Sequence, residues 1–238
     1  MANVFSMQGD GVIRRVAGII FRPHAILAEL VTRPAWMATW VFILIVWAAV
    51  GGWLLSTDIG QQALVDERVR VVEAFGGKVS DQAYDAMLTS PPWSVYVTSG
   101  GRLLLTPVAT LAAAVTLWAV ARRDGAHARF VQALAVVVHT SIVLLLGQLV
   151  ATPLHYVRES LTSPLNLAAV LPLMEEGSFQ ARLFGTLDLF ALWWAGLLAA
   201  GLDALTGRGV GRYLTAILIG YAGVAVAVAA LIAIMGGA

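Results

Sequence analysis

Hydrophobic and polar positions fall in long blocks along this chain. Five apolar blocks are each long enough to cross the ~30 Å hydrocarbon core of a bilayer as a helix. They cover residues 36–55, 101–120, 130–151, 183–205 and 213–235. Trp36 and Trp40 open the first block and Trp53 closes it, as in the aromatic belts of membrane interfaces. The pattern predicts an all-α, polytopic helix bundle with five transmembrane helices.

The segment before the first block, residues 1–35, has amphipathic character. Its apolar residues fall at helical spacing, with arginines between them: Val12, Ile13, Val16, Ile19 and Ile20. Pro23 fits the first turn of a second short helix that ends before Pro34. We expect two helices lying on an anionic membrane surface. A loosely ordered basic tail is the alternative interpretation.

Two longer polar loops connect the blocks. In the loop 56–99 we expect helices at 61–75 and 81–88, too short together to hold a core of their own. In the loop 154–182, Ser163 as N-cap and Pro164 as first residue predict a short helix over 165–171. That helix either lies in the interface or re-enters the membrane. Pro107 should kink the second block, and Pro153 should end the third.

Composition narrows the chemistry. Hydrophobic residues make up 59% of the chain and charged residues 12%, against about 25% charged in soluble domains. The net charge of +1 gives no field that favours nucleic acid. The chain has no cysteine, which excludes disulfides and thiolate metal sites. No zinc-binding His pair or nucleophile motif is present. We therefore expect no enzyme, no cofactor and no metal.

Positive charge sets the expected orientation. With the N-terminus inside, nine arginines lie in cytoplasmic segments, and the short loops 121–129 and 206–212 are both basic. Six cationic residues spread over the two longer outer loops. This distribution predicts that the N-terminus lies inside, in the cytoplasm, and the C-terminus outside.

Asp188 is the first candidate for function, because it falls inside the fourth apolar block. A charged Asp at mid-span costs about 2.5–3.5 kcal/mol on insertion scales, so such acids usually pair or act. Arg102 and Arg182 are expected near the same level, and a buried structural ion pair is the plain interpretation. A proton, ion or ligand role, or an acid facing a water-filled crevice, are the alternatives. Trp193 and Trp194 are expected to pack beside it.

Three further polar residues fall within the apolar blocks. His139 is expected near mid-depth as a neutral residue hydrogen-bonded to a neighbouring helix, although pairing with Asp188 is also compatible with the sequence. Gln148, nine residues later, faces a different neighbour. Asp203 is expected at the cytoplasmic end, in an interfacial ion pair with an arginine. Gly196 and Ala200 form a small-xxx-small pair, which favours close helix packing or an oligomer contact.

Four ordered motifs resemble a known family. They are Arg22-Pro23-His24 with Pro34, the run Ala135 to His139, the stretch Leu161 to Leu167, and Leu187 to Trp194 followed by Ala200-Gly201-Leu202. Together they resemble bacterial members of the Yip (Ypt-interacting-protein) family of five-span membrane proteins. Eukaryotic relatives are adaptors for Rab-type GTPases that use a long cytosolic N-terminal region and an Asp-Leu-Tyr-Gly-Pro element. This chain shows neither feature. The resemblance therefore implies a protein of a bacterial cytoplasmic (inner) membrane and no GTPase-adaptor role. It brings no established activity from the bacterial members and supplies no catalytic residues.

Two functions remain open on the sequence. One is a scaffold or membrane-organising subunit that contacts the bilayer and either a membrane-protein partner or further copies of itself. The other is a small transporter, channel or lipid-moving protein with a polar path past Asp188 and His139.

Overall fold

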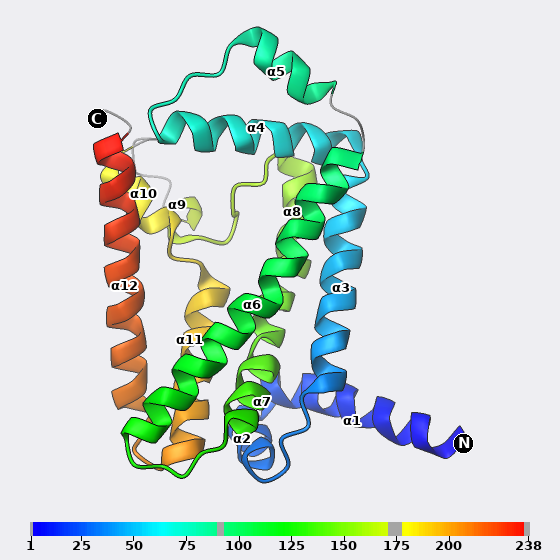
Figure 1. Cartoon of the computed structure of the whole chain (residues 1–238), viewed down its shortest axis with the longest axis vertical. Coiled ribbons are helices and arrows are strands. Elements are labelled where there is room, and N and C mark those ends of the chain that lie inside the picture. The colour runs from blue at the N-terminus through cyan, green and yellow to red at the C-terminus, as the bar shows by residue number, and fades with distance from the viewer. Residues whose placement is uncertain (1, 90–92, 171–177, 236–238) are drawn as a thin grey trace. The chain divides into compact units, whose positions relative to one another are not determined.

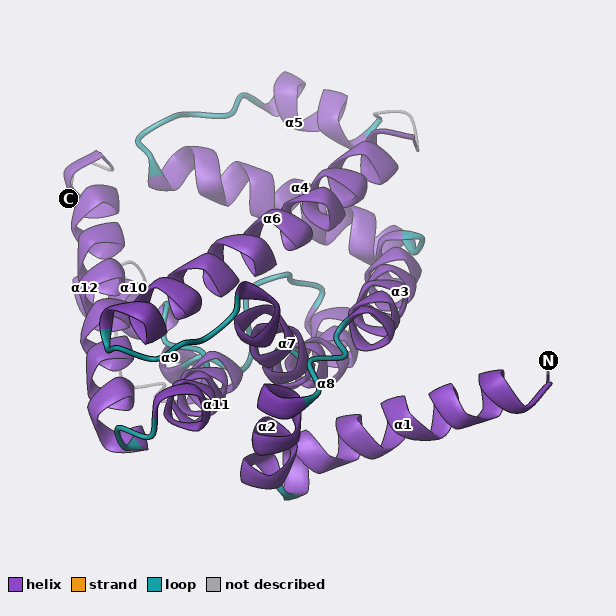
Figure 2. Cartoon of the chain, turned by 60° about the horizontal axis from the view of Figure 1, so that its bottom comes forward, coloured by secondary structure: helices purple, strands orange, loops and turns teal. Residues whose placement is uncertain are grey.

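Helices make up the regular structure of the chain. The computed structural model describes residues 2–89, 93–170 and 178–235, and within these ranges there are helices and no strand (Figure 2). Five helical segments are long and apolar enough to cross a membrane: Met37–Leu55, Leu104–Arg123, Phe130–Arg158, Leu189–Thr206 and Val210–Met235. The predicted all-α bundle with five membrane helices is confirmed.

Twelve helices follow one another within the described ranges (Figure 1). They are α1 (Ala2–Phe21), α2 (Pro23–Thr32), α3 (Met37–Leu55), α4 (Asp58–Ala74), α5 (Asp81–Leu88), α6 (Trp93–Arg123), α7 (Phe130–Thr140), α8 (Ile142–Arg158), α9 (Leu167–Val170), α10 (Phe179–Gly185), α11 (Leu189–Thr206) and α12 (Val210–Met235).

The chain divides into two compact units. Unit 1 contains 1–47, 103–146 and 190–219, and unit 2 contains 48–102, 147–189 and 220–238.

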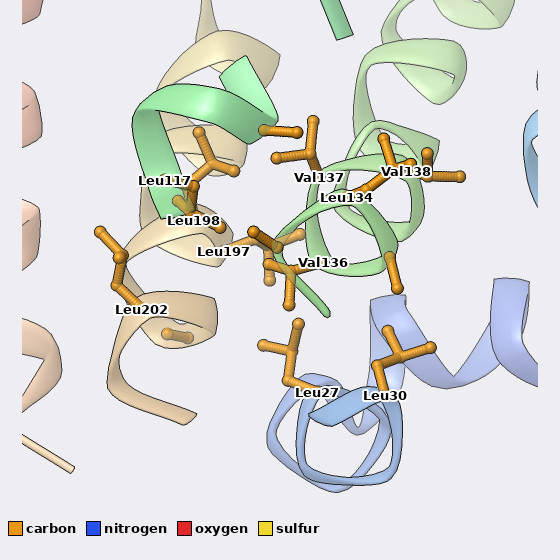
Figure 3. Close-up of a cluster of buried hydrophobic side chains, with 14 of the residues drawn as sticks. Leu27, Leu30, Leu117, Leu134, Val136, Val137, Val138, Leu197, Leu198 and Leu202 are labelled. Atoms are coloured by element: carbon orange, nitrogen blue, oxygen red, sulfur yellow. The ribbon is translucent and has the colours of Figure 1, made fainter. Parts of the chain in front are cut away.

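The core of unit 1 forms around α7. Every residue of α7 from Ala133 to Thr140 is buried. Its valines and leucine meet apolar side chains of α2, α6 and α11, including Leu27, Leu117 and Leu198 (Figure 3). A helix that is apolar all round is expected at the centre of a bundle.

The α1–α2 hairpin of unit 1 is held by an ion-pair cluster. Arg14 donates to Glu29 at 2.8 Å and Arg15 donates to the same carboxylate at 3.2 Å. The hydrogen bond from Arg14 is the main cause that lowers the pKa of Glu29 below its ordinary value. Pro23 is the first residue of α2, as expected from its missing N–H. Both helices predicted for this segment exist, and their place at a membrane interface stays a prediction.

In unit 2, side-chain caps begin the short helices of the polar loops. Thr57, Ser80 and Ser178 accept hydrogen bonds from backbone N–H groups in the first turns of α4, α5 and α10. The Tyr84 hydroxyl donates to Asp66 at 2.7 Å and thereby ties α5 to α4. The helices expected at 61–75 and 81–88 are therefore present as α4 and α5.

Several predicted boundaries are wrong. Helix α6 begins at Trp93, before residue 101 where the second block was predicted to start, so Pro107 lies well inside the helix. Pro153 lies inside α8, which continues to Arg158. The third apolar segment is instead interrupted at Ser141, where the hydroxyls of Thr140 and Ser141 both donate to the carbonyl of Val137. Such back-bonding competes with the helical hydrogen bonds and often bends a helix.

Candidate functional site

Asp188 lies outside the fourth membrane helix, contrary to the sequence prediction. Helix α10 ends at Gly185 and α11 begins at Leu189, so Asp188 is the residue directly before α11. That position is one where Asp is strongly preferred, because its carboxylate can accept from backbone N–H groups of the first turn. The apolar block that the sequence shows as continuous is therefore two helices with a short extended segment between them.

The extended segment at Asp188 pairs with a distant stretch of unit 2. Asn166 and Asp188 form an isolated antiparallel bridge. Leu167 N donates to Leu187 O at 3.0 Å, and Leu189 N donates to Leu165 O at 3.1 Å. The Ser163 hydroxyl adds a side-chain bond by donating to Oδ2 of Asp188 at 3.0 Å. Pairing of this kind satisfies the backbone groups that leave the helical ladder.

A tyrosine from α12 completes this arrangement. Asp188 N donates to the hydroxyl of Tyr221 at 3.3 Å, and this hydroxyl in turn donates to Thr186 O at 2.6 Å. We call the group Ser163, Asn166, Thr186, Asp188 and Tyr221 the Asp188 clasp. It joins three separate stretches of unit 2 through polar contacts made mostly by backbone groups.

Asn166, rather than Ser163, begins the short helix of this loop. Its Oδ1 accepts from Ala169 N at 2.8 Å, and the residue is 5% exposed. Helix α9 spans Leu167–Val170, so Pro164 is not a helical residue and the prediction of Ser163 as N-cap is wrong. The predicted helix extended to residue 171, which lies outside the described residues.

The sequence predicts an ion pair of Asp188 with Arg102 or Arg182, and the structure tests only the second partner. Arg182 is the basic residue of the last turn of α10, and among the described residues no ion pair joins it to Asp188. The side chain of Arg102 lies outside what the structure describes, so an Asp188–Arg102 pair stays a prediction.

His139 forms the second polar site, inside unit 1. The side chain is 0% exposed, and both of its ring nitrogens have partners. Nδ1 lies 2.8 Å from Ala135 O, and Nε2 lies 3.0 Å from the hydroxyl of Thr39. A carbonyl oxygen can only accept, so Nδ1 carries a proton. Complete burial disfavours the charged ring, and in the neutral ring Nε2 accepts from Thr39. His139 is thus assigned as a neutral residue bonded to a neighbouring helix, and its ring nitrogens are not available to Asp188.

A second hydrogen bond lies next to this histidine. Thr140 accepts from the indole N–H of Trp194 at 3.1 Å, which ties α7 to α11. Trp193 lies on another face of α11, 40% exposed, with its ring 6.1 Å from that of Phe190. The two tryptophans therefore have different roles in packing, and their proximity to Asp188 stays a prediction.

Gln148 and Asp203 make local contacts. Gln148 donates to the Thr152 hydroxyl at 3.2 Å, one turn along α8. Oδ1 of Asp203 accepts from Gly209 N at 2.7 Å and closes the turn between α11 and α12. No ion pair of Asp203 is present among the described residues, so the predicted pair with an arginine is wrong.

A different acid makes the ion pair near this turn. Asp124 accepts from Tyr213 at 2.6 Å and from Arg212 at 3.0 Å. The hydrogen bond from Tyr213 is the largest cause that lowers the pKa of Asp124, and Arg212 acts in the same direction. Asp203 thus bonds to the backbone of the turn, and Asp124 is the acid that pairs with Arg212.

Close helix packing also occurs at an unexpected glycine. A Cβ added to Gly201 would lie 2.3 Å from Cγ1 of Val136 on α7. A Cβ added to Gly196 would meet nothing within 4 Å. Gly196 itself therefore makes no tight contact in the described structure, and the close approach of α11 to α7 depends on Gly201.

The comparisons with known proteins agree with this architecture. The model of the Yip1 domain family matches residues 17–234. The chain belongs to the Yip1 family. No curated protein and no solved structure matches it at the significance required. As a Yip1 protein with five apolar helices, the chain is a membrane protein in contact with the lipid bilayer.

Two of the motifs that carried the resemblance to this family now prove to be paired in space. Residues 163–167 and 187–189 form the two sides of the bridge in the Asp188 clasp. Sequence reasoning missed Thr39 and Tyr221, whose hydroxyls complete the two polar sites. A buried histidine needs a partner for each ring nitrogen, and this requirement was the only indication of Thr39 in the sequence.

What the two sites can do chemically follows from these contacts. Within the described residues, no group of three or more His, Asp or Glu side chains is placed to hold a metal ion. The Asp188 clasp contains one carboxylate and the hydroxyls of Ser163 and Tyr221. Both hydroxyls are also hydrogen-bonded to backbone groups. Both sites are arranged to hold segments together.

Proposed function

We propose that this Yip1 protein is a non-enzymatic scaffold or membrane-organising subunit of a bacterial cytoplasmic membrane. Its N-terminus lies inside and its C-terminus outside, in accord with the basic loops 121–129 and 206–212. Its protein contact is a second membrane protein or another copy of itself.

The state of His139 carries this proposal. Histidine is the side chain best suited to relay a proton or act as a base near neutral pH. Here the ring is 0% exposed, and both nitrogens are engaged by groups of the same unit. A catalytic or proton-conducting histidine needs an accessible nitrogen. We therefore infer that the polar side chains of the membrane helices stabilise the fold. The function is then carried by the exposed surfaces.

The test is capture of the tagged chain from its native membrane in mild detergent, after brief cross-linking and with mass spectrometry of the product. The proposal predicts a defined complex, with a partner or a second copy in fixed stoichiometry. His139→Gln is the matched variant. If the His139→Gln protein is folded, as judged by size-exclusion chromatography, it should form the same complex as the wild type.

Reconstitution tests the opposite outcome. Proteoliposomes containing the wild type or Asp188→Asn should have the same ion and proton permeability as empty liposomes. A flux that needs the wild-type protein and disappears in Asp188→Asn would show a transporter and contradict the scaffold.

A further inference from the structure

An apolar groove runs between α1 and α3 in unit 1. Its volume is about 620 Å³, which falls in the range of about 300–1,000 Å³ typical of small-molecule sites. The residues along it are all apolar: Val12, Ile13 and Val16 from α1, and Ala38, Val41, Phe42 and Ile45 from α3. A groove without polar groups offers nothing to hold water or a polar ligand.

The two walls of the groove indicate the kind of molecule that fills it. Helix α3 is one of the five apolar segments, so its exposed side chains Val41 and Ile45 belong in hydrocarbon. Helix α1 adds Ile13, whose side chain is 71% exposed. A hydrocarbon chain of the bilayer fits a groove whose one wall is a membrane helix.

Charge beside the groove favours a lipid with an anionic headgroup. Residues 11–35 contain four arginines against one acidic residue, Glu29. Arg14 follows the groove residue Ile13 in sequence, and its side chain is 59% exposed even though it binds Glu29. Arg33 is exposed just before α3, and it forms no ion pair within the described part of the chain. Exposed arginines next to an apolar face are typical of binding to anionic lipid.

We propose that the α1–α3 groove binds one acyl chain of an anionic phospholipid whose phosphate lies at Arg14 and Arg33. The bound lipid fills the space between the α1–α2 hairpin and α3. The hairpin is then fixed by the Arg14–Glu29 pair on one side and by lipid on the other. This inference concerns a specific lipid site and does not depend on the scaffold proposal.

The experiment is native mass spectrometry of the full-length protein in detergent, titrated with dioleoyl phosphatidylglycerol or dioleoyl phosphatidylcholine. We expect one phosphatidylglycerol per copy, bound more tightly than phosphatidylcholine. Ala38→Phe places a ring in the groove at an exposed position and should weaken this binding at least tenfold. Ala112→Phe, at an exposed position of α6, is the matched control and should bind as the wild type does.

The headgroup is tested with a second pair of variants. Arg33→Gln should weaken phosphatidylglycerol binding about fivefold, which corresponds to the ~1 kcal/mol of one arginine near an anionic surface. Arg158→Gln, at another exposed arginine, should have no effect. Binding of phosphatidylcholine should be the same in both variants.

Three results would overturn the proposal. They are equal binding of the two lipids, unchanged binding in a folded Ala38→Phe protein, or the same loss in Ala112→Phe. If Ala38→Phe does not fold, a bimane label on Ile45→Cys in this cysteine-free chain decides the question. One equivalent of phosphatidylglycerol with a brominated acyl chain should quench this label, and failure to quench it would refute the site.

Discussion

The hydroxyl of Ser163 donates a hydrogen bond of 3.0 Å to the carboxylate of Asp188, 25 residues further along the chain. This contact joins the two stretches whose backbones form the Asn166–Asp188 bridge. An acid that the sequence placed deep in a membrane helix thus closes a junction between non-helical segments.

Removing either side of this contact should destabilise the protein. Ser163→Ala should cost about 1.5–3 kcal/mol, the range for a hydrogen bond to a charged group. Asp188→Asn should also lower stability, because a neutral amide oxygen accepts the Ser163 hydrogen bond more weakly than the carboxylate does. The double variant should lose less than the sum, as residues in contact do. Thermal unfolding in detergent measures all three, and strictly additive losses would contradict a direct contact.

The two arginines that the sequence places near Asp188, Arg102 and Arg182, should behave differently. Arg102→Gln combined with Asp188→Asn should be non-additive if the predicted pair exists. Arg182→Gln should be additive with Asp188→Asn, because among the ion pairs of the described residues none joins these two. The same detergent melts give both cycles. Additivity for Arg102 as well would remove both arginines as partners.

Gly201 should tolerate no larger residue. In Gly201→Ala the new Cβ would lie 2.3 Å from Val136, which is 0% exposed and cannot move aside. Overpacking of this kind typically costs about 1–3 kcal/mol. Gly196→Ala on the same helix is the control. Its Cβ meets nothing within 4 Å, and it should be neutral or gain about 0.5–1 kcal/mol from helix propensity.

A compensating change provides an internal check of this contact. Val136→Ala opens space opposite Gly201, so it should restore part of the stability lost in Gly201→Ala. No restoration would mean that the loss has another cause.

The contribution of Thr39 to the stability of the protein should come from its hydroxyl group alone. Thr39→Val keeps the shape of the side chain but leaves Nε2 of His139 without a partner in a fully buried site, at a cost of about 1–3 kcal/mol. Thr39→Ser keeps the hydroxyl and should be the milder change. Equal losses in the melting of the two variants would show that methyl packing, and not the hydrogen bond, is the contribution of Thr39.

Acid should loosen the α1–α2 hairpin. The pKa of Glu29 is lowered in the folded protein, so its ion pairs add stability above the ordinary Glu pKa of about 4.3. This stability decreases as the pH falls through the lower pKa of the folded state. The difference in melting temperature between the wild type and Glu29→Gln should be constant near neutral pH and shrink below about pH 4.3. A gap independent of pH would mean that the charge of Glu29 contributes nothing.

Hydropathy was sufficient to predict the membrane helices, because about 20 apolar residues in a row have few other solutions. It was insufficient at Asp188. Residues 183–187 belong to an apolar block that hydropathy does not divide, and the backbone groups of Leu187 and Leu189 bond instead to residues 165–167. A long-range pairing of this kind leaves no local pattern in the sequence. The Asp directly before Leu189 was the one available indication of a helix start.

The environment of His139 was predicted in kind but not in detail. A neutral, bonded histidine follows from the cost of leaving a polar group unpaired in an apolar core. The identity of its partner does not follow, because Thr39 is 100 residues away and looks like any other threonine in an apolar helix. Asp203 shows the same limit, since only the turn geometry reveals that Gly209 N needs its oxygen.

The place of Tyr221 in the clasp has a consequence for biosynthesis. This residue belongs to α12, the last helix of the described chain, yet its hydroxyl binds the backbone on both sides of Leu187. A nascent chain can insert its first four membrane helices and still leave this junction open. The junction can close only after the fifth membrane helix has left the ribosome. A chain released before that point should therefore be degraded by membrane proteases, although four of its helices are already inserted.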